Sequence, residues 1–482
     1  MKPLQELTTL ARRLPDVKIT GITADSRAVK PGYLFAALPG TQVDGRRFIP
    51  DAVAAGAVAV LAVPGTEAEV PVIESEEPRL TLAQIAMSFH EGQPRTVVGI
   101  TGTNGKTSVA RFTQQLWSAF GVKAGTLGTL GAFAPGYEYA LRHTTPDPVE
   151  IHQILSTMTT MGTTHLAMEV SSHGLSQFRA DGIHFSHAAF TNITQDHLDY
   201  HPDFEDYFQA KLRLLTELMP KDGVAVINMD GPGSQRAAEE TRAAGRQVFT
   251  VGRKGEDIIL HDLVPTTDGL RVTLSWKAVR RTLELPLIGA FQADNALVAA
   301  GLAIVTGFDG EEVIEHLADL SAAPGRMQRA GTRVFSGGGE AAAYIDFAHT
   351  PDAIETALAA IRPHTEGRLH VVFGAGGDRD RAKRPLMAAA AAKGAERVII
   401  TDDNPRTEDP ASIRDEVAKG APDAIVIAGR REAIEEGIKG LAPGDVLLVA
   451  GKGHEQGQTI GTVTYPFDDV DVTAKLLGEV NA

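Results

Sequence analysis

The sequence predicts an α/β protein of three domains, in which a middle parallel sheet precedes a doubly wound sheet. Its 482 residues exceed what one hydrophobic core ordinarily organises. A glycine-rich loop follows an apolar run at residues 97–100, and from about residue 326 short apolar runs alternate with helical stretches. Such alternation is typical of parallel strands joined by helices. We therefore place the three domains at residues 1–93, 94–325 and 326–482.

The composition describes a water-soluble globular chain and excludes several classes of function. Apolar residues make up 43% of the sequence, charged residues make up 22%, and the net charge is −15. An acidic chain lacks the basic face that binds nucleic acid, and the absence of cysteine excludes disulfides and thiolate metal sites. No signal pattern opens the chain, and no apolar run approaches the ~20 residues that span a bilayer. We expect a cytoplasmic monomer that does not insert into membranes and that acts on small molecules.

The first domain carries short apolar runs at residues 33–37 and 58–62, which we expect to be strands. The middle domain opens with the glycine-rich loop of residues 102–108, Gly-Thr-Asn-Gly-Lys-Thr-Ser, between a strand and a helix. Glycines let the backbone approach an anion, and the N–H groups at a helix start point at it. In such a loop Lys106 reaches the outer phosphates of a nucleotide, and the next hydroxyl can ligate Mg²⁺. We therefore expect a P-loop ATPase-like parallel sheet here.

Ile100 stands where the strict P-loop pattern has its first glycine, so an ordinary strand-to-helix turn remains an alternative. Further strands of the middle domain are expected at residues 166–168 and 224–227.

The last domain is predicted to be Rossmann-like, because its apolar runs and helical stretches alternate without a break. Ligands of such a sheet bind in the loops that follow the carboxyl ends of the strands. The glycines of residues 374–377 do not make a dinucleotide fingerprint, since Arg379 occupies the sixth position of G-x-G-x-x-G. Strands are expected at residues 343–345, 369–373, 398–400, 424–427 and 446–449, and helices from Asp352 and Lys383.

Ionisable residues gather after two strands of the middle domain. Glu169 ends the run of residues 166–168, where a carboxylate can hold Mg²⁺ against phosphates. Residues 196–201 contain two aspartates and two histidines, which is costly unless charge is shared or a metal is bound. A solvated polar loop is the alternative. Lys211, on a helical stretch, would by itself be a surface lysine.

Together these motifs resemble the Mur ligases, which build the peptide stem of bacterial cell-wall precursors. The resemblance implies an ATP-dependent amide ligase that adds the third amino acid to UDP-N-acetylmuramoyl-L-alanyl-D-glutamate. ATP would phosphorylate the D-glutamyl carboxylate, and the incoming amine would attack the acyl phosphate. The related folylpolyglutamate synthases share the central reaction scheme, but they are not known for the N-terminal pattern. The resemblance follows family order over essentially the whole chain and rests on residues 102–108, 169–173, 196–201, 324–327, 346–352 and 451–455.

The resemblance also implies roles in the nucleotide and metal sites. Lys106, Lys211 and His197 would be catalytic. Thr107 and Glu169 would hold Mg²⁺, and His197 would ligate a second metal ion. Lys211 matches a lysine that CO₂ carbamylates, which turns a cation into an anion that can bridge metal. The predicted ATP-binding residues are Gly102, Thr103, Asn104, Gly105, Lys106, Thr107, Ser108, Asn295, Arg326 and Asp346.

The same resemblance places the UDP-sugar precursor on the first domain and on loops of the middle domain. Either first-domain segment, residues 24–27 or 41–45, could by itself be a surface turn. Gln292 and Phe347 depart from the asparagine and tyrosine usual in the family, and His143 replaces a frequent asparagine. The predicted precursor-binding residues are Ala24, Ser26, Thr41, Gln42, Val43, Thr144, Thr145, Ser171, Gln177 and Arg179.

The third amino acid would be selected in the last domain, where residues 403–406, Asp-Asn-Pro-Arg, resemble the pattern of members specific for meso-2,6-diaminopimelate. A guanidinium pairs bidentately with the distal carboxylate of that substrate, which lysine and ornithine lack. Glu455 suits its distal ammonium. If Arg406 is instead a surface arginine, L-ornithine or L-lysine remain possible. The predicted amino-acid-binding residues are Arg379, Asp403, Asn404, Pro405, Arg406, Gly451 and Glu455.

Two other classes of function remain as alternatives. A P-loop ATPase or kinase without ligation would leave Lys211 and residues 403–406 without a role. A non-catalytic nucleotide-binding scaffold would tolerate the loss of Lys106, Glu169 and His197, yet all three are present.

Overall fold

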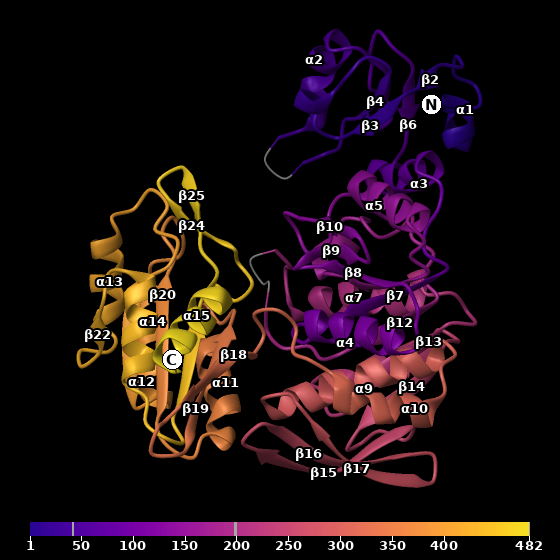
Figure 1. The fold of residues 1–482 in the computed structure, drawn as a ribbon. Helices are drawn as coiled ribbons and strands as arrows, with labels where there is room; N and C mark the ends of the chain where they lie inside the picture. Colours follow the sequence, from indigo (N-terminus) through magenta and orange to yellow (C-terminus); the bar gives the residue numbers. More distant parts are fainter. Residues whose placement is uncertain (41–42, 197–199, 482) are drawn as a thin grey trace. The chain divides into compact units, whose positions relative to one another are not determined.

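The computed structural model describes the chain except residues 41–42, 197–199 and 482, and it has the mixed α/β structure drawn in Figure 1. The chain divides into two compact units. The first unit comprises Met1–Asp257 and Val298–Gly310, and the second comprises Ile258–Leu297 and Glu311–Ala482. The predicted α/β class with parallel sheets is confirmed, whereas the exact domain boundaries stay a prediction. Among the described residues, no helix is both long and apolar enough to cross a membrane.

A four-stranded parallel sheet, in the order β3-β4-β5-β6, forms the N-terminal part of the first unit. Successive strand residues point to opposite faces. Leu34 and Leu61 therefore pack with α1 and α3, whereas Phe35 and Val60 pack with α2. The elements are β1 (Lys2–Pro3), α1 (Leu4–Leu7), β2 (Lys18–Ile19), β3 (Gly21–Thr23), β4 (Tyr33–Ala36), α2 (Ile49–Ala54), β5 (Ala57–Ala62), β6 (Val72–Glu74) and α3 (Pro78–Phe89).

A larger sheet with six parallel strands follows in the first unit, in the order β8-β11-β7-β12-β13-β14, with antiparallel β9 and β10 beyond β8. Its central strands are almost continuously apolar, because helices bury both faces of a parallel sheet. The glycine-rich loop leaves β7, between β11 and β12. The strands are β7 (Thr96–Thr101), β8 (Ala124–Gly128), β9 (Gly131–Ala134), β10 (Tyr137–Tyr139), β11 (His165–Glu169), β12 (His187–Phe190), β13 (Val224–Asn228) and β14 (Gln247–Gly252).

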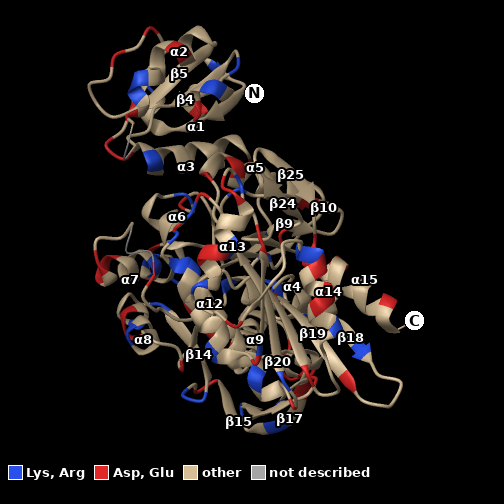
Figure 2. Ribbon diagram, turned by 90° about the vertical axis from the view of Figure 1, so that its left-hand side faces the viewer, with Lys and Arg blue, Asp and Glu red and all other residues tan. Residues whose placement is uncertain are grey.

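Three helices of this sheet, α5, α6 and α7, begin with side-chain caps, whereas α4 and α8 begin after glycines. Asp147 and Ser171 accept backbone N–H groups at the starts of α5 and α6. Figure 2 shows acidic and basic residues interspersed along α7 and α8, where Arg236 pairs with Glu205 at 2.5 Å and with Glu240 at 2.6 Å. The helices are α4 (Lys106–Ala119), α5 (Pro148–Thr160), α6 (Ser172–Ser176), α7 (Phe204–Arg213), a π-helical turn at Leu214–Leu218, and α8 (Ser234–Ala243).

The second unit begins with an antiparallel meander and then builds a six-stranded sheet in the order β18-β19-β23-β20-β21-β22. All strands of that sheet except β18 run parallel. The strands are β15 (Ile258–Thr266), β16 (Gly269–Trp276), β17 (Val279–Leu285), β18 (Gln328–Val334), β19 (Glu340–Asp346), β20 (Leu369–Ala375), β21 (Arg397–Asp402), β22 (Ile425–Val426), β23 (Val446–Ala450), and the hairpin β24 (Gly457–Ile460) with β25 (Val463–Pro466).

Helices cover both faces of the six-stranded sheet, as the doubly wound prediction requires. Val371 and Phe373 of β20 pack with α11, α12 and α13 on one face, and Val372 packs with α14 and α15 on the other. The carboxyl ends of β19, β20, β21 and β23 therefore share one edge. The helices of this sheet are α11 (Pro351–Ile361), α12 (Lys383–Gly394), α13 (Pro410–Ala418), α14 (Arg430–Lys439) and α15 (Asp469–Asn481); before them come α9 (Ala290–Val305) and α10 (Gly310–Glu315), whose residues fall partly in the first unit.

Candidate functional site

The glycine-rich loop has the backbone geometry that its sequence predicts. Gly102 and Gly105 adopt φ angles of 144° and 88°, which L side chains rarely tolerate. The loop is fastened to the end of β12 by Asn192, whose carbonyl accepts the Thr103 N–H at 2.9 Å and whose side-chain oxygen accepts the Asn104 N–H at 3.1 Å. An ordinary strand-to-helix turn would not need these features: two glycines with positive φ and hydrogen bonds to the end of a second strand, at the N-terminus of α4.

A Cβ on Gly102 would overlap the hydroxyl of Thr191, which lies directly beside the loop. We therefore expect Gly102→Ala to weaken nucleotide binding about tenfold or more, through strain at positive φ and displacement of the loop. The control is Gly121→Ala, since Gly121 also has positive φ (76°) but open space around it. Calorimetric titration with ATP should separate the two variants, and equal affinities in both would contradict a built phosphate loop.

Glu169 lies buried at the end of β11 and gathers three donors. Its carboxylate accepts the Thr107 hydroxyl at 2.9 Å, the Thr129 N–H at 2.8 Å and the Thr129 hydroxyl at 3.1 Å. A hydroxyl and a carboxylate at the mouth of a phosphate loop are the hard oxygen ligands that Mg²⁺ prefers beside nucleotide phosphates. In the described part of the chain, no group of three or more histidine, aspartate or glutamate side chains could hold a metal. The Thr107 hydroxyl and the Glu169 carboxylate fit an ion that phosphate oxygens of a nucleotide also ligate.

Two lysines converge on the loop backbone. Lys106 donates to the carbonyls of Gly102 and Thr103, each at 2.9 Å, and Lys211 donates to the Gly102 carbonyl at 2.8 Å. Lys211 is only 1% exposed and lies 4.5 Å from the ring centroid of Tyr207, so it is not a surface lysine. Burial, and then the neighbouring charge of Lys106, lowers the pKa of Lys211 well below its ordinary value.

The polar stretch of residues 196–201 is only partly described. His197 lies outside the described residues, so its place relative to the loop stays a prediction. His201 is buried and its Nδ1 contacts Asp206 at 2.6 Å, with the rings of His173 and Tyr207 nearby. The other ring nitrogen of His201, Nε2, is buried and has no hydrogen-bond partner in the described part of the chain.

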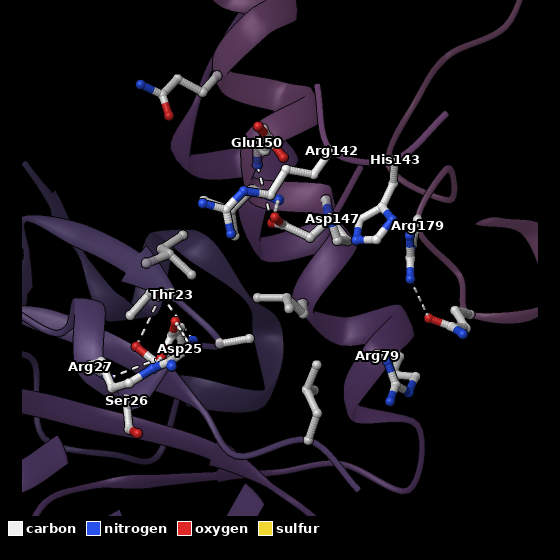
Figure 3. Close-up of a pocket in the computed structure, with 18 of the residues that line it drawn as sticks. Thr23, Asp25, Ser26, Arg27, Arg79, Arg142, His143, Asp147, Glu150 and Arg179 are labelled. Atoms are coloured by element: carbon white, nitrogen blue, oxygen red, sulfur yellow. Dashed lines mark hydrogen bonds and ion pairs between the residues drawn. The ribbon is translucent and has the colours of Figure 1, made fainter. Parts of the chain in front are cut away.

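A cavity of about 1080 Å³ lies in the first unit and is lined from the N-terminal sheet and from the loops around α5 and α6 (Figure 3). Figure 3 shows Asp25 and Arg27 on one side of this cavity and Arg142, His143 and Arg179 on the other. Arginines from separate elements can meet negative groups of a ligand, although the carboxylates of Asp25, Asp51, Asp147 and Glu150 line the same cavity. The predicted precursor-binding residues on its wall are Ala24, Ser26, Gln177 and Arg179.

Three more predicted precursor-binding residues connect to that wall or to Glu169. Arg179 donates to the Thr145 carbonyl at 2.8 Å, and the Thr145 hydroxyl accepts the Ser171 N–H at 3.0 Å. Thr144 contacts the Thr129 hydroxyl at 3.0 Å, which brings it beside the carboxylate of Glu169. Among the other predictions, Val43 is exposed and away from the cavity wall, and Thr41 and Gln42 lie outside the described residues.

In the second unit, the residues predicted to bind the nucleoside lie near the start of α9 and after β19. Asn295 donates to the buried Gln292 side chain at 3.0 Å. Asp346 accepts the N–H groups of Met327 and Ala348, each at 2.9 Å, and burial raises its pKa. The Arg326 guanidinium lies 4.9 Å from the Phe347 ring centroid, so arginine and carboxylate are held at one strand end.

The carboxyl edge of the six-stranded sheet brings together the motif of residues 403–406 and the segment of residues 451–455. The Asn404 amide donates to Glu455 at 2.8 Å. Arg406 donates to the Gly377 carbonyl at 2.7 Å and has φ 51°, so it is not a free surface arginine. Arg379 is exposed in the neighbouring loop, Pro405 is buried, and Gly451 has φ 115° beside Asp403. All seven predicted amino-acid-binding residues therefore lie in loops of one sheet edge.

Sequence reasoning missed several residues of these sites. Thr129 and Asn192 belong to no motif. They reach the site only because β8 lies beside β11, which ends in Glu169, and β12 lies beside β7, which precedes the glycine-rich loop. Arg79 and Arg142 line the cavity without having been predicted. A signal for Arg79 existed in its place at the start of a helix after a polar stretch, because helix starts bind anions.

This combination of sheets, phosphate loop and carboxyl-edge motif defines an α/β nucleotide-dependent enzyme, and family models identify which. The chain belongs to the Mur ligase family: residues 18–90 match the Mur ligase family catalytic domain, residues 100–303 the Mur ligase middle domain, and residues 325–453 the Mur ligase glutamate ligase domain. The predicted resemblance is thereby confirmed.

Particular relatives are similar over nearly their whole length. The UDP-N-acetylmuramoyl-L-alanyl-D-glutamate--2,6-diaminopimelate ligase of Caulobacter vibrioides is 50% identical, covering 97% of both chains. A solved structure of a ligase with that name is 33% identical, with a TM-score of 0.70 over 96% of this chain and 95% of its own. Mycobacterium tuberculosis folylpolyglutamate synthase, complexed with ADP and AMPPCP, shares the fold at 20% identity, with a TM-score of 0.61 over 83% of this chain and 95% of its own.

Proposed function

We propose that this protein is an ATP-dependent amide ligase that adds meso-2,6-diaminopimelate to UDP-N-acetylmuramoyl-L-alanyl-D-glutamate in peptidoglycan precursor synthesis. Family membership and the names of its relatives support the ligase activity. The observation that carries the choice of amino acid is that Arg406, held by the Gly377 carbonyl, and Glu455, held by the Asn404 amide, lie in loops at the same sheet edge. A guanidinium and a carboxylate there match the distal carboxylate and ammonium of diaminopimelate.

In the nucleotide site, residues 102–108 hold the phosphates of ATP through backbone N–H groups. Lys106 stabilises the transferring phosphoryl group, and Thr107 with Glu169 holds Mg²⁺, which supplies charge neutralisation when bound. Asn295, Arg326 and Asp346 contact the nucleoside and the phosphates. The hydrogen bonds from Thr107 and Thr129 to Glu169 support this assignment, because they fix the carboxylate in advance.

We also propose that CO₂ carbamylates Lys211 and that His197 ligates a second metal ion. The ammonium first loses one proton to give the neutral amine; the amine nitrogen then bonds to the carbon of CO₂ and loses a second proton, so that a cation becomes an anion. The burial of Lys211 beside Lys106 supports this, since both factors favour the neutral amine that attacks CO₂. The anion would then face the cationic side chain and the metal rather than water.

The precursor would occupy the cavity of the first unit, with its charged groups near Arg142, His143 and Arg179. Thr144, Thr145 and Ser171 would place the reacting carboxylate beside Glu169 and the phosphate loop. We further propose a cytoplasmic monomer whose partners are these small molecules. The prediction of a role for Thr41, Gln42 and Val43 in the same site stays a proposal.

A phosphate-release assay with an amino-acid panel tests the function. We expect phosphate only when ATP, the UDP-dipeptide and diaminopimelate are all present, with a product heavier by one diaminopimelyl residue. Phosphate release without either co-substrate would favour an ATPase that does not ligate. Incorporation of L-lysine or L-ornithine in preference to diaminopimelate would keep the ligase and reject the amino acid.

A further inference from the structure

Lys452, directly after β23, is a fully buried cation at the edge of the amino-acid site. Its side chain is 0% exposed, and its Nζ donates to the Asn404 side-chain oxygen and to the Glu455 carboxylate, each at 3.1 Å. An ammonium is costly to bury unless it is paired and hydrogen-bonded. Both acceptors of Lys452 belong to the residues proposed to bind the amino acid.

These contacts fix the orientation of the Asn404 amide. Its oxygen accepts from two donors, the Lys452 ammonium and the Thr459 N–H at 2.9 Å, so its nitrogen must face Glu455, to which it donates at 2.8 Å. A flipped amide would set its N–H groups against both of those donors. One Glu455 oxygen is therefore held from two sides, which orients the carboxylate.

The same chain of hydrogen bonds continues to Arg406. The Thr459 N–H donates to the Asn404 oxygen, and the Thr459 carbonyl accepts the Arg406 N–H at 3.1 Å. The Arg406 carbonyl in turn accepts the Gly461 N–H at 2.7 Å. Arg406 has φ 51°, a conformation that persists only where surrounding contacts impose it. Lys452 is thus linked by hydrogen bonds to two parts of the site, directly to the carboxylate of Glu455 and through Asn404 and Thr459 to the backbone of Arg406.

We propose that Lys452 is a positioning residue that sets the selectivity of the amino-acid site by orienting Asn404, Glu455 and, through the β24–β25 hairpin, Arg406. This inference rests on the proposed function. The Lys452 hydrogen bonds given by the described residues go to Asn404 and Glu455, both proposed to bind the amino acid, so we expect its loss to affect that substrate and not the others.

Steady-state kinetics of Lys452→Met test this role. We expect the KM for diaminopimelate to rise roughly ten- to hundredfold, as for loss of hydrogen bonds to a charged group, while the KM values for ATP and the UDP-dipeptide stay within about twofold. The matched control is Lys439→Met in the same domain, which removes an exposed lysine that pairs with Glu435 at 2.6 Å. This control should leave all three KM values unchanged.

Chemical rescue tests whether the site needs the positive charge of Lys452 or only the volume of its side chain. In Lys452→Ala, ethylammonium should lower the raised KM for diaminopimelate, whereas ethanol of similar size should not. If Lys452→Met does not fold, as judged by thermal unfolding, Lys452→Gln replaces it with the same expectation.

The proposal is overturned by a folded variant with an unchanged KM for diaminopimelate, by equal rises in all three KM values, or by failure of both variants to fold. Its failure differs from that of the proposed function, because in the latter case the unaltered protein itself forms no diaminopimelate-containing product.

Discussion

Replacement of Lys211 by alanine is expected to lower ligation by ~10²–10³-fold, the usual loss when one stabilising group of a preorganised site is removed. Added bicarbonate should not restore the rate, since alanine has no amine to carbamylate. The physical reason lies in the position of Lys211, buried against the Gly102 carbonyl and beside Lys106. An unmodified ammonium there would repel the metal that the phosphates require.

Two further variants distinguish the carbamate from a simple cation. Lys211→Arg keeps the positive charge but cannot be carbamylated, so it should be as inactive as Lys211→Ala. The exposed Lys221→Ala serves as control and should keep full activity. Labelled bicarbonate should give a carbamate carbon signal in the unaltered protein and none in Lys211→Ala. Near-normal turnover of Lys211→Arg, or full activity of the unaltered protein in CO₂-free buffer, would refute the role.

Much of the fold could be predicted from the sequence, because buried parallel strands leave uninterrupted apolar runs. The run of residues 97–100 became β7 (Thr96–Thr101), and that of residues 446–449 became β23. The run of residues 424–427 gave only the two-residue β22, whose side chains are exposed. It lies at the edge of its sheet, where only one neighbour, β21, imposes pairing. Local hydrophobicity does not encode the place of a strand within the sheet.

The residues of the candidate sites likewise divide into those whose role the local sequence predicts and those whose role depends on the fold. Residues 102–108 and 403–406 are local motifs, and their chemistry can be inferred from residues that are adjacent in the sequence. Thr129 and Lys452 act through partners far away in sequence, Glu169 and Asn404, so their roles depend on which strand ends meet at one edge. The local sequence does not show which strands will be neighbours, because the connections between strands can cross the sheet in more than one way.

His201 shows an ambiguity of another kind. It belongs to a stretch for which the sequence predicts either shared charge or a bound metal, and the structure buries it against Asp206. A histidine and an aspartate five residues apart read alike whether they ligate a metal or pair with each other. Only the direction of the side chains distinguishes the two cases, and that direction follows from the packing around α7.

Arg406→Leu is expected to lower kcat/KM for diaminopimelate by ~10²–10³-fold, because a bidentate charge pair is lost and the substrate carboxylate is left unpaired. The rate with L-lysine, which has no distal carboxylate, should change much less. The preference for diaminopimelate over lysine should therefore collapse, whereas the KM for ATP stays the same. Arg431→Leu in the same domain, where a half-buried arginine pairs with Glu435 at 3.4 Å, is the matched control.

The variant Arg406→Lys distinguishes the effect of a positive charge from that of the planar guanidinium. Lysine keeps a positive charge at the position but cannot present two parallel N–H donors to a carboxylate, nor as readily hold the Gly377 carbonyl at the same time. If charge alone selects the substrate, this variant should retain most of the preference. If the planar guanidinium selects it, most of the preference should be lost, as the positive φ of Arg406 and its fastening to the β24–β25 hairpin lead us to expect. An unchanged preference in Arg406→Leu would mean that Arg406 does not contact the distal carboxylate, and the choice of diaminopimelate would then have to rest on Arg379.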